Sequence, residues 1–309
     1  MLAAVAVLAA ACGSGGGSKK TTAATTAPAS AATTATTAAK VSITVASFNF
    51  GESEILANMY KDVLQKAGVD VTLRDNLGAR EVVEPALQSG QIDLVPEYVG
   101  TVLEYLDKNA GEASGDLTAT VTKLRARFTP LGVTVLDPSP AADQNAFAVS
   151  KATAAKDNLK NMSDLAPYAS KMTLGGPPEC PTRPFCQLGL QKTYGLNFKS
   201  FKALDSDGPL TKSALKNGQI DVGLVFSSDG DLNTSGLVVL NDDKHLQTVD
   251  NIVPVIRTAK ATPAVTAALN SVSAKLTTDA LIQLNQMVSI DKADPSQVAQ
   301  TWLSQNGLV

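Results

Sequence analysis

Two stretches of this chain nearly repeat each other: ALQSGQIDLV at residues 86–95 and ALKNGQIDVG at residues 214–223. In each, a helical pattern ends at a glycine, Gly90 or Gly218, and a run of apolar residues follows. Glycine directly after a helix favours the left-handed conformation that ends it, and a short apolar run is typical of a buried strand. Such units recur by chance in α/β proteins, but the shared GQID with matched flanks favours two lobes of similar fold.

The pattern around the repeat predicts how the chain is divided. Strands alternate with helices, which indicates α/β lobes with largely parallel sheets, and three helices are expected at the C-terminal end. The pattern restarts near residue 140. We therefore expect lobe 1 to comprise residues 41–140 plus 251–309, and lobe 2 to comprise residues 141–250. This is the two-lobed periplasmic-binding-protein fold of type II, in which the chain crosses twice and a ligand lies in the cleft between the lobes.

The composition argues against several classes of function. The chain has 309 residues, a net charge of −3 and a single histidine, His245. Without a clustered positive surface it does not fit a nucleic-acid-binding protein, and one histidine makes a His-based metal site or a Ser-His triad hard to build. The sequence also has no HExxH, GxSxG or Walker motif. We therefore expect no metal, no cofactor and no catalysis.

The N-terminal region predicts export and a lipid anchor. Residues 2–11 are apolar but too few to span a bilayer, so residues 1–11 are interpreted as a signal peptide. Cys12 follows LAAA and resembles the lipidated cysteine of bacterial lipoproteins, although Leu8 lies four residues before it rather than three and no Lys or Arg precedes the apolar run. We accordingly expect the natural start upstream of Met1. The alternative is a plain secretory signal with an incidental cysteine.

An Ala/Thr-rich segment separates this region from the fold. Residues 12–40 carry no apolar period and cannot bury enough surface to offset chain entropy. They are interpreted as the lipid anchor followed by a disordered tether. More than one acyl chain gives stable membrane attachment without a transmembrane helix. The expected location is therefore extracytoplasmic, with the protein lipid-anchored to the cell membrane.

The two remaining cysteines, Cys180 and Cys186, lie in GGPPECPTRPFC at residues 175–186. Because an exported protein matures in an oxidising compartment, the pair is expected to form a disulfide. Metal binding is the less favoured alternative, since no histidine or third cysteine lies nearby. Four prolines stiffen the same loop, which suits it to hold Glu179 and Arg183 in place. A stapled surface loop with no role in binding is the other interpretation.

Three segments follow strands at the edge where α/β sheets bind ligands. They are SFNFGE at residues 47–52, PEYVGT at residues 96–101 and VFSSDG at residues 225–230. In open α/β sheets a ligand lies at the carboxyl ends of strands and the N-termini of helices. These segments are therefore expected to line the cleft.

Several motifs together resemble one known family. They are SFNFGESEILANMY, LGAREVVEPALQSGQIDLVPEYVGT, TLGGPPECPTR, KTYGLNFKSFKAL, ALKNGQIDVGLVFSSDG and LVVLNDDKH. In order and spacing they are similar to the glycine betaine/choline/carnitine-binding proteins of osmoprotectant ABC importers, the ProX type, from residue 41 to the C-terminus. The resemblance implies a substrate-binding lipoprotein that delivers a small molecule to a membrane permease and is expected to act as a monomer.

The resemblance implies a tyrosine box for a trimethylammonium group. Such a group has no N–H to donate, so aromatic faces attract it by cation–π interaction. Tyr98 matches one box position, and Phe226 stands at another while keeping an aromatic face. Asn145 and Asp250 stand where two further tyrosines are expected, and Asp143 matches an acidic residue whose backbone lies near the ammonium group. We expect Tyr98 and Phe226 to face each other across the cleft, one from each lobe.

The resemblance also implies a site for a ligand carboxylate. Thr101 and Arg183 match the hydroxyl and the guanidinium of that site, and Glu179 is retained before the arginine. Phe48 takes the place of a carboxylate-binding lysine, and Asn49 follows it in the same segment. A guanidinium matches a carboxylate in charge and shape.

These departures leave alternatives open. Asp250 could replace the missing aromatic walls by direct charge pairing, so that a betaine-like ligand still binds. The pocket could instead take another small polar or zwitterionic solute whose N–H donors Asp250 and Asn145 accept. A binding-protein-fold enzyme, in which Arg183 orients a carboxylate and Asp143 or Glu179 acts as the acid, and a surface adhesin or structural lipoprotein are the remaining possibilities.

Overall fold

The computed structural model describes residues 13–17, 41–232 and 234–309. The predicted signal peptide of residues 1–11, the lipidation at Cys12 and most of the predicted tether lie outside the described residues. Within the described part of the chain, no helix is both long and apolar enough to cross a membrane. Residues 41–232 and 234–309 belong to one compact unit.

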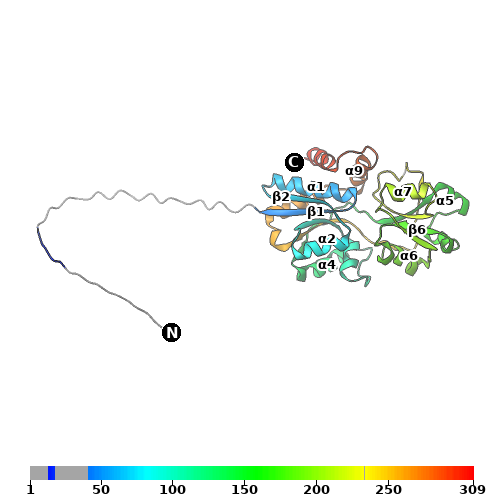
Figure 1. Ribbon diagram of the computed structural model, residues 1–309, viewed down its shortest axis with the longest axis horizontal. Helices are drawn as coiled ribbons and strands as arrows, with labels where there is room; N and C mark the ends of the chain where they lie inside the picture. The colour runs from blue at the N-terminus through cyan, green and yellow to red at the C-terminus, as the bar shows by residue number, and fades with distance from the viewer. Residues whose placement is uncertain (1–12, 18–40, 233) are drawn as a thin grey trace, which may run out of the picture. The chain divides into compact units, whose positions relative to one another are not determined.

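Figure 1 shows a sheet in each lobe of this unit. Both sheets have five strands, and their strand orders are equivalent. The sheet of lobe 1 has the order β2-β1-β3-β10-β4, with bounds Ser42–Phe48 for β1, Asp70–Gly78 for β2, Leu94–Tyr98 for β3, Val133–Val135 for β4 and Ile252–Arg257 for β10. The sheet of lobe 2 has the order β7-β6-β8-β5-β9, with bounds Asn145–Ser150 for β5, Thr173–Gly176 for β6, Ser200–Ala203 for β7, Val222–Phe226 for β8 and Leu237–Leu240 for β9. The α/β two-lobed fold predicted from the sequence is confirmed.

The sheets are mixed, whereas the sequence pattern suggested largely parallel ones. In lobe 1, β1 pairs in parallel with β2 and β3, but β10 is antiparallel to both β3 and β4. In lobe 2, β6 pairs in parallel with β7 and β8, but β5 is antiparallel to both β8 and β9. The reason is connectivity: β5 and β10 are the first strands after the chain crosses between the lobes, so they enter their sheets from the cleft edge.

The repeated sequence occupies the equivalent position in both lobes and forms the same contacts there. The glycines Gly90 and Gly218 have positive φ, 81° and 65°, as expected for the ends of their helices. The aspartates Asp93 and Asp221 then accept a hydrogen bond from the backbone of the neighbouring strand, at 2.9 and 2.8 Å. The shared GQID therefore maintains the fold, and its functional value is that each following strand ends at the cleft.

Helices cover both faces of each sheet. Figure 1 shows α1 on one face of the lobe 1 sheet and α2 and α4 on the other, and α7 and α6 on opposite faces in lobe 2. The helices of lobe 1 before the first crossing are α1 (Gly51–Lys66), α2 (Arg80–Ser89), α3 (Val99–Leu106) and α4 (Leu117–Phe128). Those of lobe 2 are α5 (Lys151–Asp157), α6 (Gln187–Tyr194) and α7 (Pro209–Lys216). The C-terminal helices α8 (Pro263–Ser273), α9 (Thr278–Ser289) and α10 (Pro295–Gln305) pack on α1.

Short 3-10 turns connect several of these elements. They are η1 (Thr129–Leu131), η2 (Met162–Leu165), η3 (Ala169–Lys171), η4 (Cys180–Thr182) and η5 (Thr258–Lys260). Of these, η4 carries the first cysteine of the proline-rich loop, and Arg183 directly follows it. Each lobe has its own core of buried apolar residues. The strands contribute to both cores, and α1 contributes to the core of lobe 1.

The two chain crossings lie side by side between the lobes. The first leads from β4 to β5 and the second from β9 to β10, and Ala142 and Asn251 pair across them as an antiparallel bridge. The amide of Asp143 donates to the carbonyl of Asp250 at 3.1 Å. Two predicted site residues, Asp143 and Asp250, therefore lie at the crossings, which is where two-lobed binding proteins have their hinge.

Candidate ligand-binding site

A cavity between the lobes collects every residue that the sequence predicted to bind ligand. Its volume is about 50 Å³, room for a few water-sized groups, so it suits only a small solute. The predicted residues in its wall are Phe48, Asn49, Tyr98, Thr101, Asp143, Asn145, Glu179, Arg183, Phe226 and Asp250. The other residues of the wall are Phe50, Ala79, Arg80, Pro177, Cys180, Cys186, Ser206, Leu224.

Aromatic rings from both lobes meet in this cavity. Tyr98 is the last residue of β3, and Phe226 is the last residue of the equivalent strand β8. Phe50 lies within reach of both, with ring centroids 6.1 Å from Tyr98 and 5.2 Å from Phe226. On its other side Phe50 stacks on Phe48 at 6.0 Å. Sequence reasoning missed Phe50, although its segment had been selected by the strand-end rule.

Glu52 ties one aromatic wall to the opposite lobe. Its carboxylate, at the start of α1, accepts hydrogen bonds from the Tyr98 hydroxyl at 2.6 Å, from Ser228 Oγ of lobe 2 at 2.5 Å and from Asn285 Nδ2 of α9 at 2.6 Å. Burial raises the pKa of Glu52, while these hydrogen bonds work in the opposite direction. The cavity is therefore closed on this side by contacts that cross between the lobes.

Arg80 is a second residue that the sequence did not reveal. Its guanidinium lies 5.1 Å from the centroid of the Phe48 ring. It also donates from Nε and Nη2 to the two carboxylate oxygens of Glu97, both at 2.8 Å. Both side chains are buried. Although burial works against it, the charge of Glu97 raises the pKa of Arg80 and keeps the guanidinium protonated.

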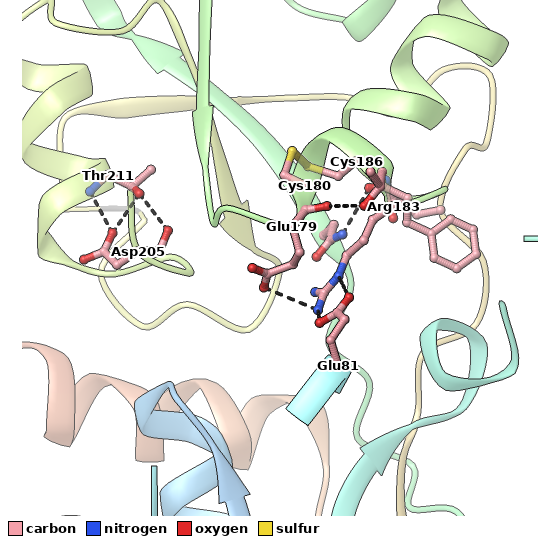
Figure 2. Close-up of a disulfide and its surroundings, with 11 residues drawn as sticks. Glu81, Glu179, Cys180, Arg183, Cys186, Asp205 and Thr211 are labelled. Carbon is pink, nitrogen blue, oxygen red and sulfur yellow. Dashed lines mark hydrogen bonds and ion pairs between the residues drawn. A yellow bond between two sulfur atoms is a disulfide. The ribbon is translucent and has the colours of Figure 1, made fainter. Parts of the chain in front are cut away.

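Arg183, the predicted carboxylate ligand, is paired with carboxylates of the protein itself (Figure 2). Its Nε and Nη2 donate to Glu81 of α2 at 3.3 and 2.8 Å, and Nη2 lies 3.3 Å from Glu179. Partial burial alone would raise the pKa of Glu81, but the bonds from Arg183 lower it. The predicted disulfide between Cys180 and Cys186 is present and closes the loop beside Arg183.

Thr101 and Asp250 are bonded to each other. The Thr101 hydroxyl donates to Asp250 Oδ2, and the amides of Gly100 and Thr101 donate to Oδ1, each at 2.9 Å. Asp250 thus caps the N-terminus of α3. Burial raises its pKa to about 6, against the effect of these bonds, so the carboxylate is charged at neutral pH. The hydroxyl that the resemblance assigned to a ligand carboxylate is here engaged by Asp250.

Asp143 and Asn145 complete the wall near the hinge. Asp143 accepts hydrogen bonds from the Ser228 amide at 2.9 Å and from the Ser227 hydroxyl at 3.2 Å. Burial and the neighbouring charge of Glu52 raise its pKa well above the usual value. Asn145 Nδ2 donates to the carbonyl of Phe185 at 3.0 Å.

Comparison with known proteins gives a consistent picture. A sequence model of the substrate-binding domain of ABC-type glycine betaine transport systems matches residues 41–305. The chain is 28% identical to a glycine-betaine-binding protein of Pseudomonas aeruginosa over 282 residues, covering 87% of this chain and 89% of that protein. It is also 28% identical to the carnitine transport binding protein OpuCC of Listeria monocytogenes over 280 residues, covering 87% and 88%.

A solved structure gives the same result for the fold. The crystal structure described as a glycine betaine/carnitine/choline ABC transporter superimposes with a TM-score of 0.66 at 25% identity, and the match covers 86% of this chain and 99% of that one.

Among the described residues, no group of three or more His, Cys, Asp or Glu side chains is placed to hold a metal ion.

Proposed function

This chain belongs to the family of substrate-binding domains of ABC-type glycine betaine transport systems, and we propose that it captures a small quaternary-ammonium or zwitterionic osmoprotectant of the glycine betaine, choline or carnitine type. In this account the protein acts outside the cytoplasm and delivers the ligand to a membrane permease. The family and the fold are those of substrate-binding proteins, which are not enzymes.

The aromatic cluster is the observation that carries the proposal. Tyr98 and Phe226, from opposite lobes, line one small cavity, and Phe50 contacts both rings. A trimethylammonium group binds to aromatic faces because their quadrupoles attract a cation that cannot donate an N–H bond. Asp250, charged at neutral pH, adds a carboxylate to the same wall. We propose that Phe50 supplies one of the walls that the sequence suggested were missing.

Closure of the two lobes provides the mechanism of capture. Ser228 and Glu52 bond across the cleft on one side of the cavity, and Arg183 and Glu81 pair across it on another. We propose that the ligand enters when the hinge opens and that these contacts re-form around it. The permease would then recognise the closed, loaded protein.

Titration calorimetry with choline, glycine betaine, carnitine and a panel of amino acids tests the proposal. We expect one-to-one binding of at least one quaternary ammonium compound, without turnover. Binding confined to amino acids would instead support the alternative of a different small polar solute. Consumption of a titrated compound would support an enzyme of the same fold.

The N-terminal part of the proposal concerns the anchor. We propose that Cys12 carries the lipid and that residues 12–40 hold the binding domain away from the membrane. The support is the apolar segment that ends in LAAAC and the Ala/Thr composition that follows it. Cys12→Ser should release the protein from the membrane fraction of the producing cell. Unchanged fractionation of this variant would contradict the anchor.

A further inference from the structure

We propose that Glu81 makes this site selective for an organic cation without a carboxylate, because Glu81 occupies the guanidinium that a ligand carboxylate would need. The inference rests on the proposed function and narrows its ligand class from cations and zwitterions to cations such as choline. Glu81 is thereby a specificity-determining residue supplied by the lobe opposite Arg183.

The first step is the geometry of the pair. Glu81 lies in the first turn of α2 in lobe 1, and Arg183 follows η4 in lobe 2. Both Glu81 oxygens accept from the guanidinium, at 3.3 and 2.8 Å, in the two-point arrangement with which a carboxylate ligand would bind (Figure 2). Glu179 approaches the same guanidinium at 3.3 Å. Arg183 therefore already has two carboxylate partners from the protein.

The second step is that the other cation in the wall is also engaged. Among the described residues that line the cavity, the cationic side chains are Arg80 and Arg183. Arg80 is held by Glu97 through two hydrogen bonds of 2.8 Å, in a buried pair. A ligand carboxylate consequently finds each guanidinium neutralised by a carboxylate of the protein.

The third step concerns the acidic residues in the wall of the cavity. Among the described residues, the acidic side chains in the wall of the cavity are Asp143, Glu179 and Asp250, and Glu179 is also one of the two partners of Arg183. A guanidinium has further N–H donors, but a third carboxylate at Arg183 would approach two that are already there. Like charges brought together in a partly desolvated site cost free energy. A zwitterion must therefore either accept that repulsion or displace Glu81 and open an interlobe contact, whereas a ligand with only a cationic head meets neither penalty.

Choline and glycine betaine provide the test because they share the trimethylammonium head and differ at the other end. For the wild-type protein, calorimetry at neutral pH should give a dissociation constant at least tenfold lower for choline than for glycine betaine. Glycine betaine should bind to Glu81→Gln about tenfold more tightly than to wild type, because Arg183 no longer pairs with the carboxylate of Glu81. The dissociation constant of choline should change by less than threefold.

A matched control removes an ion pair of the same kind that lies inside one lobe. Glu112 accepts from Nε and Nη2 of Arg127, and both residues belong to lobe 1, away from the cavity. Glu112→Gln should leave both dissociation constants unchanged. Thermal unfolding of the variants verifies that they fold. We expect Glu81→Gln to fold because the side chain of Glu81 is 44% exposed.

Each other outcome has a defined meaning. If wild type prefers glycine betaine, or if Glu81→Gln weakens both ligands to the same extent, Glu81 is only a closing contact and the inference is wrong. An unchanged ratio of the two constants in Glu81→Gln overturns it as well. If wild type binds neither compound, the proposed function itself fails, which is a distinct result.

Discussion

The hydroxyl of Ser228, in lobe 2, donates a hydrogen bond of 2.5 Å to the carboxylate of Glu52, in lobe 1. The same carboxylate accepts a bond of 2.6 Å from the hydroxyl of Tyr98. One buried acidic group thus joins the closure of the cleft to the position of an aromatic wall. A change in either hydrogen bond is therefore expected to alter ligand binding.

Ser228→Ala removes a contact that exists only while the lobes are together. A hydrogen bond contributes about 1 kcal/mol net, so the variant should release labelled choline roughly fivefold faster. A chase experiment with excess unlabelled choline measures this rate. The control is Ser235→Ala, because the hydroxyl of Ser235 bonds to Leu232 within lobe 2. Equal release rates for both variants would show that the Glu52 contact does not hold the cleft closed.

Phe50→Ala tests the aromatic residue that the sequence did not single out. The ring of Phe50 contacts Tyr98 and Phe226, so its removal takes away one π face and loosens the other two. A desolvated cation–π contact is worth about 2 kcal/mol. Its loss corresponds to a dissociation constant for choline that is about 30-fold higher. Phe50→Tyr keeps the face and should bind within threefold of wild type. Wild-type affinity in Phe50→Ala would remove this residue from the site.

Asp250 should make cation binding depend on pH. Its pKa is raised to about 6 by burial, so the carboxylate is charged at pH 7.5 and mostly protonated at pH 5. Choline should therefore bind wild type more weakly at pH 5. Asp250→Asn should bind choline about tenfold more weakly than wild type at pH 7.5 and should lose most of the difference between the two pH values. Arg80, Glu97 and Asp143 surround Asp250 electrostatically, and the comparison with the variant isolates its own contribution.

The same raised pKa has a consequence for stability. Because the folded protein holds the Asp250 proton more tightly than the unfolded chain does, the contribution of Asp250 is present at low pH and is lost as pH rises through about 6. The free energy of unfolding of wild type relative to Asp250→Asn should accordingly fall by about 2 kcal/mol between pH 4 and pH 7. Urea titrations at the two pH values measure this difference. A pH-independent difference would contradict the raised pKa.

The disulfide should stabilise the loop that carries Arg183. Replacing Cys180 and Cys186 together by serine removes a short cross-link, for which chain entropy predicts a loss of roughly 2 kcal/mol in the free energy of unfolding. We also expect the Glu81→Gln effect on glycine betaine to shrink in this background, because Arg183 is less well positioned. Two free thiols in the native exported protein would rule out the bond itself.

The sequence predicted the fold well because its signals are local. Gly90 and Gly218 end helices at positive φ, and Asp93 and Asp221 join neighbouring strands, so the repeated segment imposes the same backbone in each lobe. Strand ends then converge at the cleft by topology. This is why residues chosen by the strand-end rule and by resemblance line a single cavity.

The pairing of charged groups within the cavity could not be predicted in the same way. Arg183 meets Glu81 across 102 positions of sequence, and no local pattern marks that contact. Phe50 could not be predicted in this way because it lies beyond the end of β1, at the cap of α1, where strand alternation does not indicate which way a side chain points. The ligand class that we propose rests on these tertiary contacts, so the sequence indicated the kind of receptor but not the charge of its ligand.

A crystal structure of the protein grown with choline tests the central claim most directly. The account predicts density for the ammonium group within about 6 Å of the ring centroids of Tyr98, Phe50 and Phe226, with the pair between Glu81 and Arg183 intact. Choline bound elsewhere, or an ammonium group that lies away from these rings, would contradict the account.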